Sequence, residues 1–114
     1  MKSLYLESGI NHFGNIKEAH KILNFFLKSK LRNLTFMLQT DEFYRKQKSL
    51  GIDFKLPENF YKLAIDKIHS KNKKIGLSVC RLKTYNELSH LKFDFFKILG
   101  AGVSQNDLIK KIKK

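Results

Sequence analysis

Short apolar segments alternate with longer amphipathic segments along the chain. Four apolar segments predict β-strands, at residues 4–7, 34–39, 75–80 and 94–98. Apolar residues at helical spacing predict helices at residues 16–29, from Pro57 to Ile68, from Thr84 to Leu91 and from Ser104 to Ile112. The polar stretch 40–56 lies between the second strand and the second helix. It is long enough to form an active-site loop or to hide a helical turn.

Three of the predicted helices have a recognisable start. Asn15 followed by Glu18, and Thr84 followed by Glu87, have the spacing of a capping box. In that motif the N-cap side chain and the acid three residues later each bind the other's backbone N–H. Pro57 suits the first turn of a helix, because its missing N–H would have no partner there in any case. We therefore expect helices to begin at these three positions.

Strands that alternate with helices predict an α/β fold with a parallel sheet and right-handed crossovers. The chain has room for about four β/α units of roughly 30 residues each. Such units form either half of a (β/α)8 barrel, which is a partial TIM-type barrel, or a small doubly wound sheet. A complete barrel takes roughly 250 residues. The 114 residues of this sequence fit a single domain over residues 1–114.

The composition indicates a folded protein of a reducing compartment. Hydrophobic residues make up 42% of the chain, which is enough for a packed core. The single cysteine excludes a disulfide framework and a zinc site built on several cysteines. The first residues lack the apolar core of a signal peptide, and no apolar run approaches the roughly 20 residues that cross a bilayer. We therefore expect a cytoplasmic protein without membrane contact.

The net charge is +13, from 23 Lys and Arg residues against 10 Asp and Glu residues. Such an excess favours anionic partners, which include nucleic acid, acidic membranes and phosphorylated or carboxylated small molecules. The sequence argues against a dedicated nucleic-acid-binding protein, because 20 of these basic residues are lysines and none of their runs interleaves with aromatic residues. The lysines are dispersed, apart from Lys71, Lys73 and Lys74 and from Lys110, Lys111, Lys113 and Lys114 near the end of the sequence. We interpret most of the charge as solvated helix faces.

Polar residues follow the predicted strands, at the edge where parallel α/β folds hold their functional groups. The candidates are Glu7, Asn11 and His12 after the first strand, Gln39 and Thr40 after the second, Ser78, Cys80 and Arg81 at the third, and Lys97 in the fourth. A carboxylate and an amine at strand ends, such as Glu7 and Lys97, suit acid–base chemistry or the binding of an anion. From the residues alone, local ion pairing or solvation explains these two side chains equally well.

Residues 7–15, Glu-Ser-Gly-Ile-Asn-His-Phe-Gly-Asn, closely resemble a motif of the N-acetylneuraminate (sialic acid) synthase family. That motif, E-x-G-I-N-H-x-G-(D/N/S), follows the first strand of the family. Shorter similarities continue in the same order. Residues 36–40 resemble the V-K-x-Q-T of the family's second strand, residues 76–80 its third strand, residues 95–98 its (F/Y)-K-I fourth strand, and residues 106–110 the helix after it. The resemblance covers nearly the whole chain.

This resemblance implies a (β/α)8 barrel and a phosphoenolpyruvate-dependent condensing enzyme of nonulosonic acid biosynthesis. Family members join phosphoenolpyruvate to an N-acylated hexosamine-type sugar and use a divalent metal, Mn or Mg. By resemblance, Glu7 is the catalytic carboxylate at the sugar and phosphoenolpyruvate site. The substrate-binding residues are then Asn11 and His12 in the adjoining loop, Gln39 and Thr40 at the end of the second strand, and Lys97, which contacts the anionic phosphoenolpyruvate.

The sequence also departs from the family pattern. Met37 stands where the family has a lysine for the phosphate, residues 78–81 replace its S-T-P-F block, and residues 100–102 replace an S-G-(D/E) turn. The family's metal-binding histidines belong to the second half of the barrel, and its C-terminal antifreeze-like domain has no counterpart in this sequence. We therefore expect a truncated or split synthase-like chain that holds no metal itself.

Half a barrel leaves its first and fourth strands without a neighbour, and natural proteins cover or pair such edges. We therefore expect self-association or a complementary half-barrel, with phosphoenolpyruvate and the sugar as ligands. Two other interpretations stay open. One is a noncatalytic remnant that has kept the fold, which Met37 and Arg81 favour. The other is a basic module that binds nucleic acid or a membrane surface, which depends on net charge alone.

Overall fold

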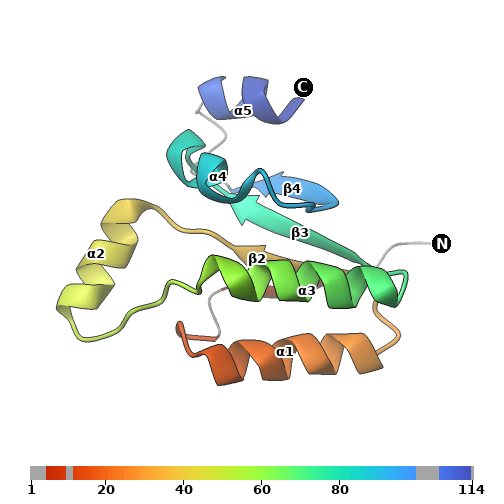
Figure 1. Cartoon of the computed structure of the whole chain (residues 1–114). Helices are drawn as coiled ribbons and strands as arrows, with labels where there is room; N and C mark the ends of the chain where they lie inside the picture. The colour runs from red at the N-terminus through yellow and green to blue at the C-terminus, as the bar shows by residue number, and fades with distance from the viewer. Residues whose placement is uncertain (1–4, 10–11, 100–105, 114) are drawn as a thin grey trace.

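The computed structural model describes residues 5–9, 12–99 and 106–113, and strands alternate with helices along them (Figure 1). In chain order the elements are β1 (Tyr5–Gly9), α1 (Ile16–Lys28), β2 (Asn33–Met37), α2 (Asp41–Ser49), α3 (Glu58–Ser70), β3 (Lys74–Val79), α4 (Leu82–Leu88), β4 (Phe95–Ile98) and α5 (Asn106–Lys113). Asn11, the turn at 100–102 and the start predicted at Ser104 for the last helix lie outside the described residues. None of the described helices has the length and apolar character needed to cross a membrane.

The four strands form one parallel sheet in the order β1-β2-β3-β4. Each strand lies beside the strand that precedes it in the sequence, so the sheet is wound in one direction and the connecting helices fall on one face. A doubly wound sheet reverses its direction and carries helices on both faces. The strand order thus decides between the two predicted architectures. The fold is α/β, with four consecutive units of the TIM-barrel type.

The two faces of the sheet differ in what covers them. Leu34 and Phe36 on β2, like Ile75 and Leu77 on β3, are fully buried in the core beneath the helices. Side chains alternate along a strand, so the intervening residues point to the opposite face, which we call the inner face. The inner face carries Tyr5, Glu7, Asn33, Thr35, Met37, Gly76, Ser78, Phe95 and Lys97. In a closed barrel this face lines the interior.

The inner face is concave. β1 and β4 are the outer strands, and on a flat sheet three strand spacings would separate them by about 14 Å. The rings of Tyr5 on β1 and Phe95 on β4 nevertheless meet edge to face, with centroids 5.6 Å apart. The Phe95 ring lies so close over Gly76 that a Cβ atom there would collide with it. The sheet therefore curves as a barrel segment does, and Gly76 makes room for the ring that crosses it.

The start of α1 confirms Asn15 as its N-cap. The side-chain oxygen of Asn15 accepts hydrogen bonds from the N–H groups of Lys17 and Glu18, at 2.9 and 3.2 Å. Glu18 does not close the predicted box, because its carboxylate pairs with Lys21. The Asn15 N–H donates instead to the carbonyl oxygen of His12. This bond ties the loop after β1 to the first turn of α1.

The predicted start of α4 is wrong. This helix begins at Leu82 with Arg81 as its N-cap, so Thr84 lies inside the first turn. The Thr84 hydroxyl donates to the carbonyl oxygen of Arg81 at 3.1 Å and is therefore not a capping acceptor. The earlier start lets Leu82 pack against the hydrophobic core.

The polar stretch 40–56 contains a nine-residue helix, α2, which is longer than the predicted helical turn. Thr40 caps this helix, since its hydroxyl oxygen accepts a hydrogen bond from the N–H of Phe43 at 3.2 Å. None of the residues of α2 is buried. Its half-buried apolar residues, Phe43 and Tyr44, are adjacent and form no stripe at helical spacing, which is why the sequence pattern does not reveal the helix. Figure 1 shows α2 projecting beyond the carboxyl ends of β2 and β3.

Candidate functional site

A pocket of about 380 Å³ opens on the inner face, at the carboxyl ends of all four strands. Its lining consists of Glu7, Ser8, Gly9, Thr35, Phe36, Met37, Ser78, Lys97, Ile98 and Leu99. This is the edge at which α/β barrels hold their functional groups. We therefore treat this inner-face pocket as the candidate site.

Glu7 and Lys97 meet in the inner-face pocket, although 90 residues separate them in the sequence. The ammonium nitrogen of Lys97 lies 2.5 Å from a carboxylate oxygen of Glu7. It also lies 4.4 Å from the centre of the Tyr5 ring, within the range of a cation–π contact. Lys97 thus has a fixed position over the concave face. The structure brings together the two strand-end charges that the sequence singles out, and it pairs them with each other.

The wall of the pocket supplies small polar side chains. In the strand register, Lys97 lies beside Ser78, and Ser78 lies beside Met37, while Glu7 lies beside Thr35 in the preceding row. The hydroxyl of Ser8 donates to the carbonyl oxygen of Thr35 at 3.1 Å, next to the irregularity in the β1–β2 pairing. An ammonium group near hydroxyls can hold an anionic group, and the Glu7 carboxylate can accept a hydrogen bond from a hydroxyl of a ligand.

Gln39 lies above this pocket, but Thr40 does not belong to it. The Gln39 side-chain amide donates to the sulfur of Met37 at 3.0 Å, and its backbone N–H donates to the Tyr44 hydroxyl at 2.9 Å. Burial raises the pKa of Tyr44 to about 12, so its hydroxyl remains protonated at neutral pH. Thr40 caps α2 and borders a separate cavity of about 300 Å³ together with Arg81.

His12 lies in the protein interior and not in the pocket. Its side chain is 1% exposed, and its ring packs against Phe36 with centroids 6.1 Å apart. Nδ1 accepts a hydrogen bond from the N–H of Gly14 at 2.8 Å, which leaves the proton of the neutral ring on Nε2. Burial lowers the pKa of His12, and Nε2 has no partner among the described residues. In this structure His12 holds the loop after β1 in place.

The described residues do not form a divalent-metal site. Within residues 5–9, 12–99 and 106–113 there is no group of three His, Cys, Asp or Glu side chains that could hold a metal ion. Glu7 is the one carboxylate of the inner-face pocket, and Lys97 already neutralises it. Manganese or magnesium would need further oxygen or nitrogen ligands.

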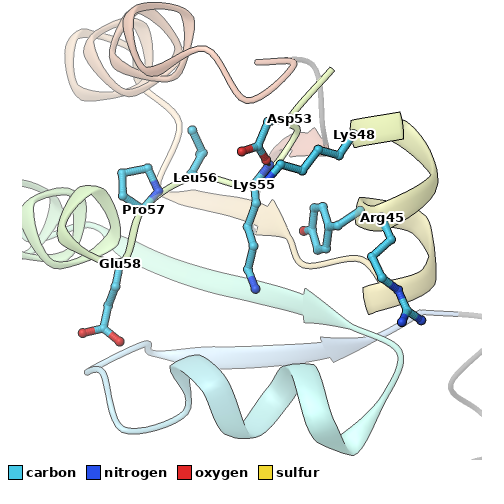
Figure 2. Close-up of a pocket in the computed structure, with 8 residues that line it drawn as sticks. Arg45, Lys48, Asp53, Lys55, Leu56, Pro57 and Glu58 are labelled. Atoms are coloured by element: carbon cyan, nitrogen blue, oxygen red, sulfur yellow. The ribbon is translucent and has the colours of Figure 1, made fainter. Parts of the chain in front are cut away.

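A larger cavity of about 470 Å³ lies between α2 and the segment that leads to α3 (Figure 2). Lys55 crosses it, lies 5.5 Å from the Tyr44 ring centre and pairs with Glu87 at 2.9 Å. Glu58 pairs with Lys62 and with His90. Figure 2 shows Arg45 and Glu58 at opposite ends of the residues that line this cavity. These charges mostly neutralise one another, and no pair of a nucleophile and a base lines the cavity, so we place no chemistry there.

Thr35 is the pocket residue that the sequence pattern hides. Residues 34–39 contain no regular alternation of apolar and polar residues, and the segment therefore predicts a strand buried on both faces. The signal is the single small polar residue between Leu34 and Phe36. Thr35 is buried because the long side chains of the outer strands cover the inner face.

Comparison with known proteins shows what the fold is similar to. No protein-family model and no curated protein matches the sequence. A crystal structure of N-acetylneuraminic acid (sialic acid) synthetase from Leptospira borgpetersenii matches with a TM-score of 0.67 and 16% identity, over 82% of this chain and 34% of that one. The spore coat polysaccharide biosynthesis protein SpsE from Bacillus subtilis matches with a TM-score of 0.63 and 16% identity, over 84% of this chain and 28% of that one.

The chain thus spans about a third of the length of the solved structures that it matches. The matches confirm the resemblance to sialic acid synthases at the level of the fold. Four parallel strands that alternate with helices correspond to part of a synthase barrel.

Proposed function

We propose that this chain forms the substrate-contacting first half of a sialic acid synthase-type barrel, which condenses phosphoenolpyruvate with an N-acylated hexosamine-type sugar. The main support for this proposal is the ion pair between Glu7 and Lys97, which lies in a concave pocket at the carboxyl ends of the strands. The matched synthetase structure and the motif at residues 7–15 support the same proposal.

Lys97 would hold the anionic end of phosphoenolpyruvate. Its ammonium group is a point charge on a rigid strand, and the hydroxyl of Ser78 lies beside it in the register. Glu7 would turn from Lys97 and accept a hydrogen bond from the sugar, which orients the sugar toward phosphoenolpyruvate. Both substrates would thus replace contacts that the two side chains now make with each other.

Met37 makes the site incomplete for a multiply charged ligand. In the resembling family a lysine stands at this position, and here a thioether faces the pocket and accepts a hydrogen bond from Gln39. One ammonium group would then neutralise the negative charge that two ammonium groups neutralise in the family. This observation also favours the second candidate function, a noncatalytic module that has kept the fold and no longer binds phosphoenolpyruvate.

The missing part of the site would come from further β/α units. β1 and β4 are the outer strands of the described sheet, and their free edges can pair with other strands. A complementary half-barrel or a second copy would cover these edges and close the inner face. Any metal ligands of the reaction would belong to these further units.

An amide ¹H–¹⁵N correlation spectrum recorded during a phosphoenolpyruvate titration tests the proposal. We expect saturable shifts at Glu7, Thr35, Ser78 and Lys97, and we expect Lys97→Gln to abolish them. Lys83→Gln is the matched control, because Lys83 also pairs with a carboxylate, Asp41, but borders a different cavity. Shifts that persist in Lys97→Gln, or that never saturate, would contradict the proposal.

Met37→Lys separates the two candidate functions. If the pocket still binds phosphoenolpyruvate, a second ammonium group should tighten binding several-fold, because it adds attraction for the phosphate. A noncatalytic module without this ligand would show no change. Weaker binding than in the wild type would count against both the pocket and the family alignment at this position.

A further inference from the structure

The amino-terminal ends of β2 and β3 carry a dense group of positive charges, far from the inner-face pocket. The group comes from the end of α1 with the α1–β2 connection and from the α3–β3 connection, which lie side by side in Figure 1. It consists of Lys28, Lys30, Arg32, Lys71, Lys73 and Lys74, and we call it the basic end.

Hydrogen bonds hold the two connections together. The Arg32 guanidinium donates to the carbonyl oxygen of Asn72 at 2.8 Å, and the Lys74 N–H donates to the carbonyl oxygen of Arg32 at 2.9 Å. Lys73 extends its ammonium group to the carbonyl oxygens of Phe26 and Ser29, at 2.8 and 2.7 Å. Lysines that lie some forty residues apart in the sequence are therefore neighbours in the fold.

Among the residues that the structure describes, the charges of the basic end have no acidic partners. Across the described part of the chain, every ion pair lies elsewhere, and none of the six cations binds a carboxylate. Asp94 lies at the same end of the sheet, but it binds the His69 ring and the N–H of Ile75. The pKa of Lys73 is lowered, first by desolvation and then by the nearby charges of Arg32 and Lys71. The positive charges of the basic end therefore repel one another.

Helix dipoles explain a part of this arrangement. Lys28 lies in the last turn of α1, and Lys73 binds the carbonyl oxygens at the end of that helix, so both suit its negative end. The dipole effect fades beyond the last turn. Lys71 is the C-cap of α3 and also suits the negative end of a helix. Lys30 and Lys74 lie outside the helices and are exposed, so the helix dipoles do not explain their place in the group.

We propose that the basic end binds the phosphate backbone of nucleic acid without sequence preference. Lysine supplies point charges that suit phosphates. The basic end contains only one arginine, and arginine is the side chain that makes bidentate contacts to bases, so this surface favours the backbone over the base sequence. None of the exposed large apolar side chains belongs to residues 28–32 or 71–74. Protein interfaces are depleted in lysine and depend on apolar anchors, which disfavours a protein partner. Folding thus joins the lysine cluster of residues 71–74 to the cations of residues 28–32 in one phosphate-binding surface.

An anionic membrane is the rival partner. Phe25 lies one helical turn before Lys28, and its side chain is 62% exposed. An apolar side chain beside cations can anchor a protein in the headgroup region of a bilayer. One aromatic ring at the margin of the group gives little buried area, so the surface fits phosphodiester chains better. The test below includes vesicles for this reason.

Fluorescence anisotropy with a labelled duplex of mixed sequence, recorded over a series of salt concentrations, tests the proposal. The test variant carries Lys28→Gln, Lys30→Gln, Lys71→Gln and Lys74→Gln. The control carries Lys17→Gln, Lys46→Gln, Lys110→Gln and Lys111→Gln, four exposed lysines elsewhere, so both variants lose the same charge. The slope of log affinity against log salt should fall by up to about 0.9 for each contacting lysine that is removed. We expect this loss in the test variant and little change in the control.

Equal losses in the two variants would overturn the proposal, because net charge and not the basic end would then govern binding. Tighter binding to vesicles of anionic lipid than to the duplex would overturn it in favour of a membrane. A third variant with arginine at the same four positions should keep the salt slope. This result would show that the loss of binding in the glutamine variant is not caused by unfolding. The inner-face pocket is not involved, so the phosphoenolpyruvate titration of the test variant should match that of the wild type.

Discussion

The two ends of the sheet differ in how they arrange charge. At the carboxyl ends of the strands, opposite charges lie together, as in the Glu7–Lys97 and Asp41–Lys83 pairs. At the amino ends of β2 and β3, six cations lie together, and none of them forms an ion pair with a carboxylate of the described residues. A single net charge of +13 therefore hides a molecule with a mixed end and a basic end.

The polarity of the helices explains a part of this difference. Helices of β/α units run against the strands, so their first turns lie at the carboxyl edge and their last turns at the amino edge. First turns contain acids, for example Glu18 in α1 and Glu58 in α3, and last turns contain Lys28 and Lys67. Each placement suits the helix dipole, and repeating it in successive units separates the charges along the sheet. A rule for single helices thus shapes the field of the whole domain.

Gly76→Val should have the largest effect, because it changes the inner face on which the Glu7–Lys97 pair of the mixed end lies. A branched side chain at this position collides with the Phe95 ring, so the inner face must open or the ring must move. We expect the free energy of unfolding to fall by about 1–3 kcal/mol, as for other overpacked sites. Urea unfolding measures this loss. Adding Phe95→Ala to the Gly76→Val variant should restore part of the lost free energy of unfolding, because the two residues share one contact. Strictly additive losses in the double variant would contradict the concave geometry.

Acid should weaken the mixed end through His12. Its pKa is lowered from 6.5, so below that pH the unfolded chain binds a proton that the folded chain does not. The free energy of unfolding should then decrease as the pH falls, by at most about 1.4 kcal/mol per pH unit. Urea unfolding between about pH 5 and pH 7 measures the slope.

His12→Phe keeps an aromatic ring in this position and should remove that slope. His20→Gln, which changes a histidine on α1 outside the loop, should keep it. A wild-type slope that survives in His12→Phe would show that other groups control the acid sensitivity.

The positions of the four strands and of three helices follow from the sequence, because their buried residues leave a recognisable pattern. The strand order does not, since the pattern fits both a barrel segment and a doubly wound sheet. In α2 only the adjacent apolar residues Phe43 and Tyr44 are half-buried, so its full length does not follow from that pattern. Thr84 has the spacing of a cap, but its hydroxyl donates inside the helix, and no local pattern reveals which role a hydroxyl takes.

The proximity of Glu7 and Lys97 is predictable in part, since parallel strands end at one edge. Their direct contact depends on the curvature of the sheet, which arises from Gly76 and Phe95 in the three-dimensional packing. The basic end depends on which connections become neighbours. That information lies in the strand register, where Asn33 pairs with Lys74, and not in the spacing of the lysines.

Removing charge should have opposite effects on stability at the two ends. Glu7→Gln takes away the partner of Lys97, and because the two side chains are 62% and 36% exposed, the loss should stay below about 1 kcal/mol. The four glutamine substitutions at the basic end remove repulsion, so they should raise the free energy of unfolding by a few tenths of a kcal/mol, roughly the size of other surface charge effects. Both changes should shrink at high salt, where exposed charges are screened. Urea unfolding at low and high salt measures the sign of the change in free energy of unfolding for each variant. If the glutamine variant of the basic end also lost stability, its lysines would already be stabilised by contacts within the chain.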